Sequence, residues 1–240
     1  MKYVLDVHVH TVSSGHAYST VMDYVREAKL KGLELMGLSD HGPAMPGAAN
    51  IFHIGNQRVI PSIIEGVRVL KGVEANVIDF DGGIDIHERY LKELDFVIAS
   101  IHDVCIQPGN EIENTKMMIQ TMKNQPLVDI IGHAGNPKVP INLKEFVMAA
   151  AEYNKIIEIN NSSFTNISRS GSTERCQEIA YYAKDFGVKV IGGSDSHFHT
   201  ALGVLDTAQQ VIEKAGIEDQ YVMNLSAEKF IADLRNRRGL

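Results

Sequence analysis

Short apolar segments alternate with longer amphipathic ones along this chain, and this alternation restricts the possible folds more than any other feature of the sequence. Apolar, β-rich segments predict strands at residues 3–9, 33–38, 67–73, 96–101, 127–131, 156–159 and 188–191. Amphipathic segments predict helices at residues 21–31, 88–94, 114–123, 143–153, 173–186, 203–215 and 227–238. About seven β-α repeats of this kind predict an α/β protein with a parallel sheet and helices outside it.

Residue types that bind metals stand at the carboxyl ends of almost all of these strands, or in the loop after the first one. These residues are His8, His10, His16, His41, Glu74, His102, His133, Asp195 and His197. An open sheet would gather its ligands near one crevice, whereas in a closed barrel the carboxyl ends of all strands meet at one mouth. The distribution therefore predicts a closed or nearly closed barrel. We expect one domain over residues 1–240, because the sequence contains no linker, repeat or low-complexity segment.

These nine groups are too many for one zinc ion, which takes about four ligands. His8 and His10 are two residues apart on a predicted strand, so their side chains point the same way. A cluster of unpaired imidazoles would be costly to desolvate, and packing alone does not explain it. We therefore interpret the cluster as a site for two or three ions that share at least one carboxylate.

Composition and charge limit the partners that we expect. The 240 residues carry a formal net charge of −7, which disfavours a general nucleic-acid-binding surface, although bound cations would reverse the charge inside a cleft. The two cysteines, Cys105 and Cys176, provide no disulfide framework, in keeping with a reducing cytosol. Because we find neither a signal peptide nor an apolar run of about 20 residues, we expect a cytoplasmic protein with no membrane partner.

Seven short motifs occur in a characteristic order along the chain. They are D-V-H-V-H-T at 6–11, S-D-H-G at 39–42, G-V-E-A-N at 72–76, I-H-D at 101–103, G-H-A-G-N-P at 132–137, E-I-N-N-S-S at 158–163 and G-S-D-S-H at 193–197. Together they resemble the PHP (polymerase and histidinol phosphatase) superfamily over about residues 3–225, and most of all its small stand-alone bacterial phosphatases of the YcdX type. Ala134 stands where we expect proline in such relatives, which should not affect a ligand.

The resemblance implies a distorted (βα)7 barrel with three metal ions, normally zinc and sometimes manganese or iron. Carried over by motif, the ligands of the first ion would be His8, His10, Glu74 and Asp195. Glu74 would bridge to a second ion held by His102 and His133, and the third ion would be held by His16, His41 and His197. Some relatives carry aspartate at the position of His16, where imidazole would favour zinc over a harder ion.

The expected activity is hydrolysis of a phosphate monoester on a small molecule, with Glu74 and Asp195 as catalytic residues. Two ions bridged by Glu74 would lower the pKa of a shared water and generate hydroxide, which displaces the alcohol in line. Either Asp195 or a metal-bound water would protonate the leaving group. Arg169, in the loop after the sixth strand, is either a phosphate-binding residue or a plain surface arginine.

Several alternatives stay open at this point. The chain could hydrolyse phosphodiesters or nucleotides as an exonuclease does, hydrolyse amides, or serve as a non-catalytic metal-binding regulator. The long loop at 42–57, which carries His53, is expected to lie over the mouth and could act as a lid. Asp40 is expected either to orient a ligand or to cap a loop, and Arg235, Arg237 and Arg238 to form a solvated helix end. The natural substrate, the physiological metal and the oligomeric state are not predicted.

Overall fold

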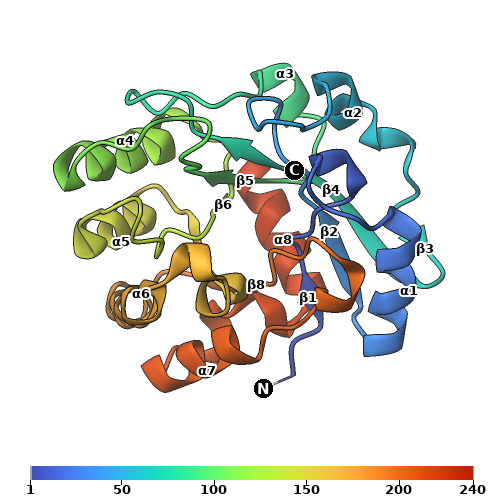
Figure 1. Cartoon of the computed structure of the whole chain (residues 1–240). Helices are drawn as coiled ribbons and strands as arrows, with labels where there is room; N and C mark the ends of the chain where they lie inside the picture. The colour runs from blue at the N-terminus through green and yellow to red at the C-terminus, as the bar shows by residue number, and fades with distance from the viewer. Residues whose placement is uncertain (1, 240) are drawn as a thin grey trace.

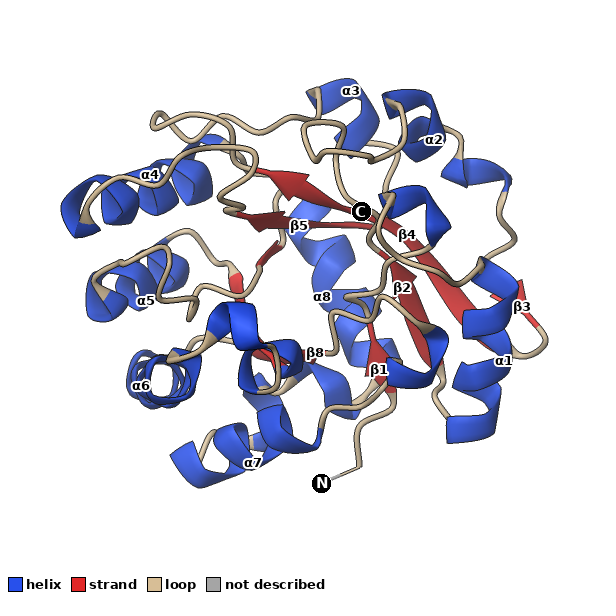
Figure 2. Cartoon of the chain, in the orientation of Figure 1, coloured by secondary structure: helices blue, strands red, loops and turns tan. Residues whose placement is uncertain are grey.

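A parallel sheet forms the centre of the molecule. The structure, a computed structural model, describes residues 2–239 apart from the side chain of Ser168. In this part of the chain the parallel strands are β1 (Leu5–Asp6), β2 (Leu35–Leu38), β4 (Val67–Asn76), β5 (Phe96–Ser100), β6 (Ile130–Ile131), β7 (Ile156–Asn160) and β8 (Val190–Gly193). They pair in that order, and β3 (Ile63–Ile64) pairs antiparallel with β4. The helices around them (Figure 1, Figure 2) are α1 (Val21–Lys31), α2 (Ile51–Gly55), α3 (Glu88–Leu91), α4 (Glu111–Asn124), α5 (Leu143–Glu152), α6 (Ser172–Phe186) and α7 (Asp206–Ala215).

The two edges of the sheet, β1 and β8, come together and nearly close it into a barrel. Beyond the ends of these strands, Val9 pairs with Ser196 in a parallel bridge. Nearer the other end, the buried side chain of Asn224 spans the gap: its Nδ2 donates to the carbonyls of Leu5 and Gly192, and its Oδ1 accepts the Gly192 N–H. The predicted distorted (βα)7 barrel is therefore confirmed.

The barrel interior is apolar at the end away from the mouth, and Phe96 fills its centre. An added Cβ atom at Gly37 or Gly72 would lie 2.7 or 2.4 Å from the Phe96 ring, so the neighbouring strands need glycine there. The apolar side chains of this layer include Leu5, Leu35, Leu70, Ile98, Ile130, Ile156 and Ile191. Side chains two residues apart on a strand point the same way. Glu74 of β4 and Glu158 of β7 therefore also point into the barrel, nearer the mouth than Leu70 and Ile156 on the same strands.

Helix α8 (Ala227–Arg238) closes the barrel at the end opposite the mouth. Its Phe230 packs into the apolar interior layer, and Figure 1 shows α8 crossing the middle of the ring of strands. The Arg238 side chain is only 7% exposed, and its guanidinium lies 2.7 Å from Asp129 Oδ2 and donates to the carbonyl of Leu91. The prediction of a solvated helix end is therefore wrong for Arg238 and also for Arg237, whose side chain is 6% exposed and pairs with Asp233, because protein acceptors replace their water.

Local capping explains some of the helix bounds that were predicted correctly, although α4 begins three residues before its predicted start, after a capping box formed by Asn110 and Glu113. Helix α1 begins after a capping box formed by Thr20 and Asp23, and it ends at Gly32, whose φ of 69° lies in the left-handed region. Strand β3 and helix α2 were not predicted, because two and five residues give no pattern to detect, and α2 lies in the segment at 42–57 that was expected to be a loop. None of the helices between residues 2 and 239 is long and apolar enough to cross a membrane.

Candidate metal centre

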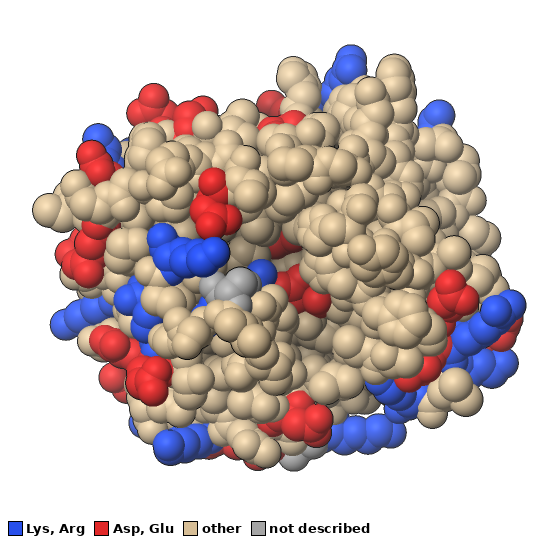
Figure 3. Space-filling view, in the orientation of Figure 1, with Lys and Arg blue, Asp and Glu red and all other residues tan. Residues whose placement is uncertain are grey.

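The structure brings all nine predicted metal-binding side chains together at the mouth of the barrel. Ligand atoms lie within 4.8 Å of one another in three overlapping groups: His8, His10 and Glu74; His10, His41 and His197; and His41, Glu74 and His102. Figure 3 shows a hollow in the middle of this face, with acidic side chains inside it and basic ones beside it. His16, His133 and Asp195 join the cluster through the contacts described below.

Glu74 lies at the centre of the cluster and is fully buried. Its two carboxylate oxygens lie 2.8 to 3.4 Å from ring nitrogens of five histidines: His8, His10, His41, His102 and His133. Strand β4 positions it, because Glu74 follows the inward-facing Leu70 and Gly72 along the same face of the strand. A carboxylate in contact with so many imidazoles is well placed to serve as a ligand that two cations share.

Asp195, the second carboxylate of the cluster, forms an ion pair with Arg169. Asp195 Oδ1 lies 3.2 Å from His10 Nε2 and 3.6 Å from His8 Nε2. Its other oxygen, Oδ2, lies 2.8 Å from Nη1 of Arg169, whose side chain is 13% exposed. Arg169 is thus a nearly buried partner of the cluster, so its interpretation as a plain surface arginine is wrong.

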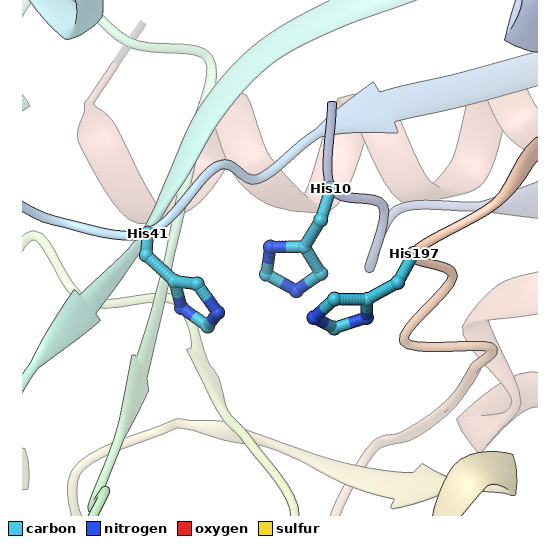
Figure 4. A group of neighbouring side chains, drawn as sticks. All are labelled: His10, His41 and His197. Carbon is cyan, nitrogen blue, oxygen red and sulfur yellow. The ribbon is translucent and has the colours of Figure 1, made fainter. Parts of the chain in front are cut away.

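Four imidazoles pack against one another on the side of the cluster formed by the chain after β1, β2 and β8. The ring centroid of His10 lies 4.2 Å from that of His41 and 4.4 Å from that of His197, and Figure 4 shows the three rings facing one another. His16, from the first loop, places its ring 5.0 Å from His41 and 4.8 Å from His197. These segments are distant in sequence, and the nearly closed barrel brings them together.

Buried polar atoms without hydrogen-bond partners show that the cluster fits metal ions. Among the described residues, His8 Nε2, His10 Nε2, His41 Nδ1 and Glu74 Oε2 are all buried and lack a hydrogen-bond partner. Such atoms destabilise a fold unless a ligand satisfies them. Imidazole nitrogens and carboxylate oxygens are the donor set that zinc accepts in proteins, so the residues present suit such ions.

Electrostatics favour ionised carboxylates in the cluster. Burial alone would raise the pKa of Glu74, but nearby His8, His102 and His41 hold it well below its usual value. Burial likewise acts to raise the pKa of Asp195, but Arg169 and His8 keep it well below its usual value. Both carboxylates therefore carry the negative charge that a cation requires.

The histidines differ in their affinity for protons. Burial holds the pKa of His10 well below its ordinary value and lowers that of His133 to about 4, so both rings are neutral near pH 7. Burial also acts to lower the pKa of His8, but the surrounding carboxylates of Glu158, Glu74 and Asp195 outweigh it and raise that pKa well above its usual value. A divalent cation would take the place of the proton on His8.

Outer contacts hold the ring nitrogens that face away from the cluster centre. Nδ1 of His10 lies 3.1 Å from Ser14 Oγ, which in turn donates to Asp40 at 2.7 Å. Nδ1 of His102 lies 2.7 Å from Asn76 Oδ1. Asp40 thus acts on a predicted ligand through Ser14, and such contacts fix the tautomer and orientation of a ligand.

Glu158, the first residue of the E-I-N-N-S-S motif at 158–163, is a buried carboxylate beside the cluster that was not predicted to be a site residue. Its Oε1 lies 2.6 Å from His8 Nδ1, and its Oε2 accepts the backbone N–H of His133 at 2.8 Å. A sequence signal was present, because Glu158 interrupts the apolar segment I-I-E-I-N at 156–160. A charged residue on the inward face of a buried strand needs a partner, and here the partners are two proposed metal ligands.

The segment at 42–57, expected to cover the mouth as a lid, is tied to the barrel. The backbone N–H of Ala44 donates to the Asp85 carboxylate, and Ile54 of α2 is buried in the core. Nε2 of His53 lies 3.3 Å from Asp40 Oδ2 and its side chain is 36% exposed, so His53 is not simply solvated. A lid movement would have to break these contacts.

The fold and the cluster define the class of protein. The family model for the PHP domain matches residues 6–215, and the chain belongs to this family. It is 52% identical to a protein named probable phosphatase from Thermoanaerobacter sp. (strain X514), over 99% of this chain and 97% of the relative. It is also 48% identical to a protein named probable phosphatase from Acetivibrio thermocellus, over 99% and 98% of the two chains. The predicted family is confirmed, and these names agree with the predicted class of phosphoric ester hydrolases.

Solved structures share the fold at low sequence identity. A histidinol phosphate phosphatase from Lactococcus lactis, crystallised with zinc, L-histidinol and phosphate, matches with a TM-score of 0.65 and 19% identity, over 90% of this chain and 95% of that one. A putative histidinol phosphatase from Listeria monocytogenes matches with a TM-score of 0.58 and 14% identity, over 83% and 97%. These matches confirm the PHP-type barrel.

Proposed function

We propose that the protein is a metal-dependent phosphatase that hydrolyses phosphate monoesters of small molecules at a cluster of three cations. The observation that carries the proposal is the buried Glu74 carboxylate, in contact with five imidazoles at the mouth of the barrel. Membership of the PHP family and the names of the relatives support the phosphatase class. The zinc, L-histidinol and phosphate of the Lactococcus lactis structure support the metal and the size of the substrate.

The ligands divide among three ions by motif and by contact. The first ion would be held by His8, His10, Glu74 and Asp195, the second by Glu74, His102 and His133, and the third by His16, His41 and His197. Zinc is the proposed metal because seven of these nine residues are histidines, and imidazole favours zinc over the harder manganese ion. Iron is the alternative with similar ligand preferences.

The chain's own residues would bind the phosphate and hold its charge. When bound, divalent cations supply hydroxide near neutral pH and offset the charge of a phosphoryl group. Arg169 carries a permanent charge beside Asp195, so its remaining N–H groups are suited to a phosphate oxygen. The pKa of Asp195 lies well below its usual value, because Arg169 and His8 outweigh the effect of burial, so Asp195 is a poor proton donor. We therefore assign the leaving alcohol's proton to water and a ligand role to Asp195.

A substrate panel on zinc-loaded protein tests the proposal. We expect turnover of small phosphate monoesters, loss of turnover after chelation, and recovery when zinc is restored. Turnover of phosphodiesters or single-stranded nucleic acid with no turnover of monoesters would replace the proposal with the phosphodiesterase alternative. Bound metal without any turnover would favour a non-catalytic regulator.

Replacing Arg169 tests its proposed contact with phosphate. We expect Arg169→Lys to lower kcat/KM about 10- to 100-fold, because a charge-assisted hydrogen bond contributes about 1.5–3 kcal/mol and lysine cannot reproduce bidentate binding. The inhibition constant of inorganic phosphate should rise by a similar factor. Arg26→Ala, an exposed change on α1, serves as the control. An unchanged inhibition constant for phosphate would mean that Arg169 does not bind phosphate and only pairs with Asp195.

A further inference from the structure

Glu158 joins two parts of the cluster that otherwise come from different strands. Its Oε1 contacts the ring of His8, which follows β1, and its Oε2 contacts the backbone of His133, which follows β6. Oε2 also accepts from Nδ2 of Asn160 at 3.1 Å, and Oδ1 of Asn160 accepts from Arg169. Glu158 is 3% exposed, so water cannot replace these contacts.

The chemistry of these contacts requires a carboxylate. All three groups around Glu158 donate: the Nδ1–H of His8, the N–H of His133 and the amide of Asn160. An ionised carboxylate accepts at both oxygens, whereas a glutamine would turn one N–H group against a donor. With Nδ1 donating, the lone pair of His8 lies on Nε2, the atom that faces Glu74 and Asp195.

The backbone of His133 gives a second reason for this contact. Its φ of 26° lies in the left-handed region, which is unfavourable for a residue with a side chain. The hydrogen bond from its N–H to Glu158 helps to hold this conformation. In this conformation its Nε2 lies 3.0 Å from Glu74 Oε1.

We propose that Glu158 is a positioning residue that sets the ring of His8 and the backbone of His133 together, and so controls the occupancy of two metal positions at once. This inference rests on the proposed ligand set, in which His8 serves the first ion and His133 the second. It does not depend on which substrate is hydrolysed.

The structure supplies a way to displace Glu158 without changing its chemistry. A Cβ atom at Gly193 would lie 1.9 Å from Glu158 Oε1 and 3.0 Å from His8 Cβ, so Gly193→Ala should break the contact between this carboxylate and the His8 ring. The φ of Gly193 lies outside the left-handed region, so alanine itself is not strained there. At the preceding residue, a Cβ on Gly192 would meet only ordinary contacts of 3.4 Å or more, which makes Gly192→Ala a matched control.

The test measures metal binding in the full-length protein, with Glu152→Gln as an exposed control for the change of charge. Zinc per chain is determined after gel filtration, zinc affinity by competition with a chelator, and folding by circular dichroism. We expect Glu158→Gln and Gly193→Ala to lose more than one zinc ion per chain and to bind zinc about 10- to 100-fold more weakly, with Gly192→Ala and Glu152→Gln unchanged.

Three results would overturn the inference. The first is a folded Glu158→Gln protein with the zinc content and affinity of the wild type, and the second is loss of a single ion. The third is failure of both Glu158→Gln and Gly193→Ala to fold, which would make Glu158 a folding residue. Because the readout is metal binding, the comparison decides the role of Glu158 even if no phosphate ester is hydrolysed.

Discussion

Glu74→Gln is expected to lower kcat/KM for phosphate monoesters by at least about 1,000-fold, and to lower the metal content of the purified protein. The reason is that the one carboxylate in contact with five imidazoles would become a neutral amide. An amide offers one weak acceptor instead of two charged oxygens, so two ions would lose their shared ligand. A loss of about 4 kcal/mol of transition-state stabilisation corresponds to this factor.

Glu174→Gln, an exposed change at the start of α6, controls for the chemistry of the substitution and should keep full activity. Activity and metal are measured on the same samples, with zinc added back to saturation. If Glu74→Gln kept wild-type metal content and activity within a factor of ten, Glu74 could not be the shared ligand.

Asn224→Ala is expected to lower the free energy of unfolding by about 3–5 kcal/mol. The buried amide joins the two edges of the barrel through three hydrogen bonds, at 2.6 Å to the Gly192 N–H, 2.9 Å to the Gly192 carbonyl and 3.1 Å to the Leu5 carbonyl. Removing the amide leaves these backbone groups buried and unpaired, at about 1–3 kcal/mol each. Some relaxation of the edges would offset part of the sum.

Urea unfolding monitored by circular dichroism measures this change. Asn236→Ala, on an exposed position of α8, is the control and should stay within about 0.5 kcal/mol of the wild type. A loss of less than about 1 kcal/mol for Asn224→Ala would mean that the barrel closes without its side-chain bridge.

Much of the fold could be predicted from the sequence, because local signals define most of the elements. The residues of α1 and α8 were predicted with the bounds that the structure has, since Thr20 and Gly32 bound the first and Ser226 and Gly239 the second. The other predicted helices and strands were shifted by one to three residues at their ends, and α2 and β3 were not predicted. That one domain spans the whole chain stays a prediction.

The nine cluster residues could be predicted because each stands near the carboxyl end of a predicted strand or, for His16, in the loop that follows one, and parallel strands bring such positions to one mouth. Glu158, by contrast, lies inside an apolar strand, where the sequence does not say which strand faces it. Arg238 was misread for a related reason: its partner, Asp129, is 109 residues away in sequence. Long-range pairing of buried charges is decided by tertiary packing, which periodicity does not report.

The most direct measurement is a crystal structure of the purified protein, with anomalous diffraction recorded on both sides of the zinc absorption edge. Our account predicts three anomalous peaks: one beside His8 and one beside His133, both in contact with Glu74, and a third beside His16. A fully active protein whose crystals show no metal peak among these side chains would contradict it.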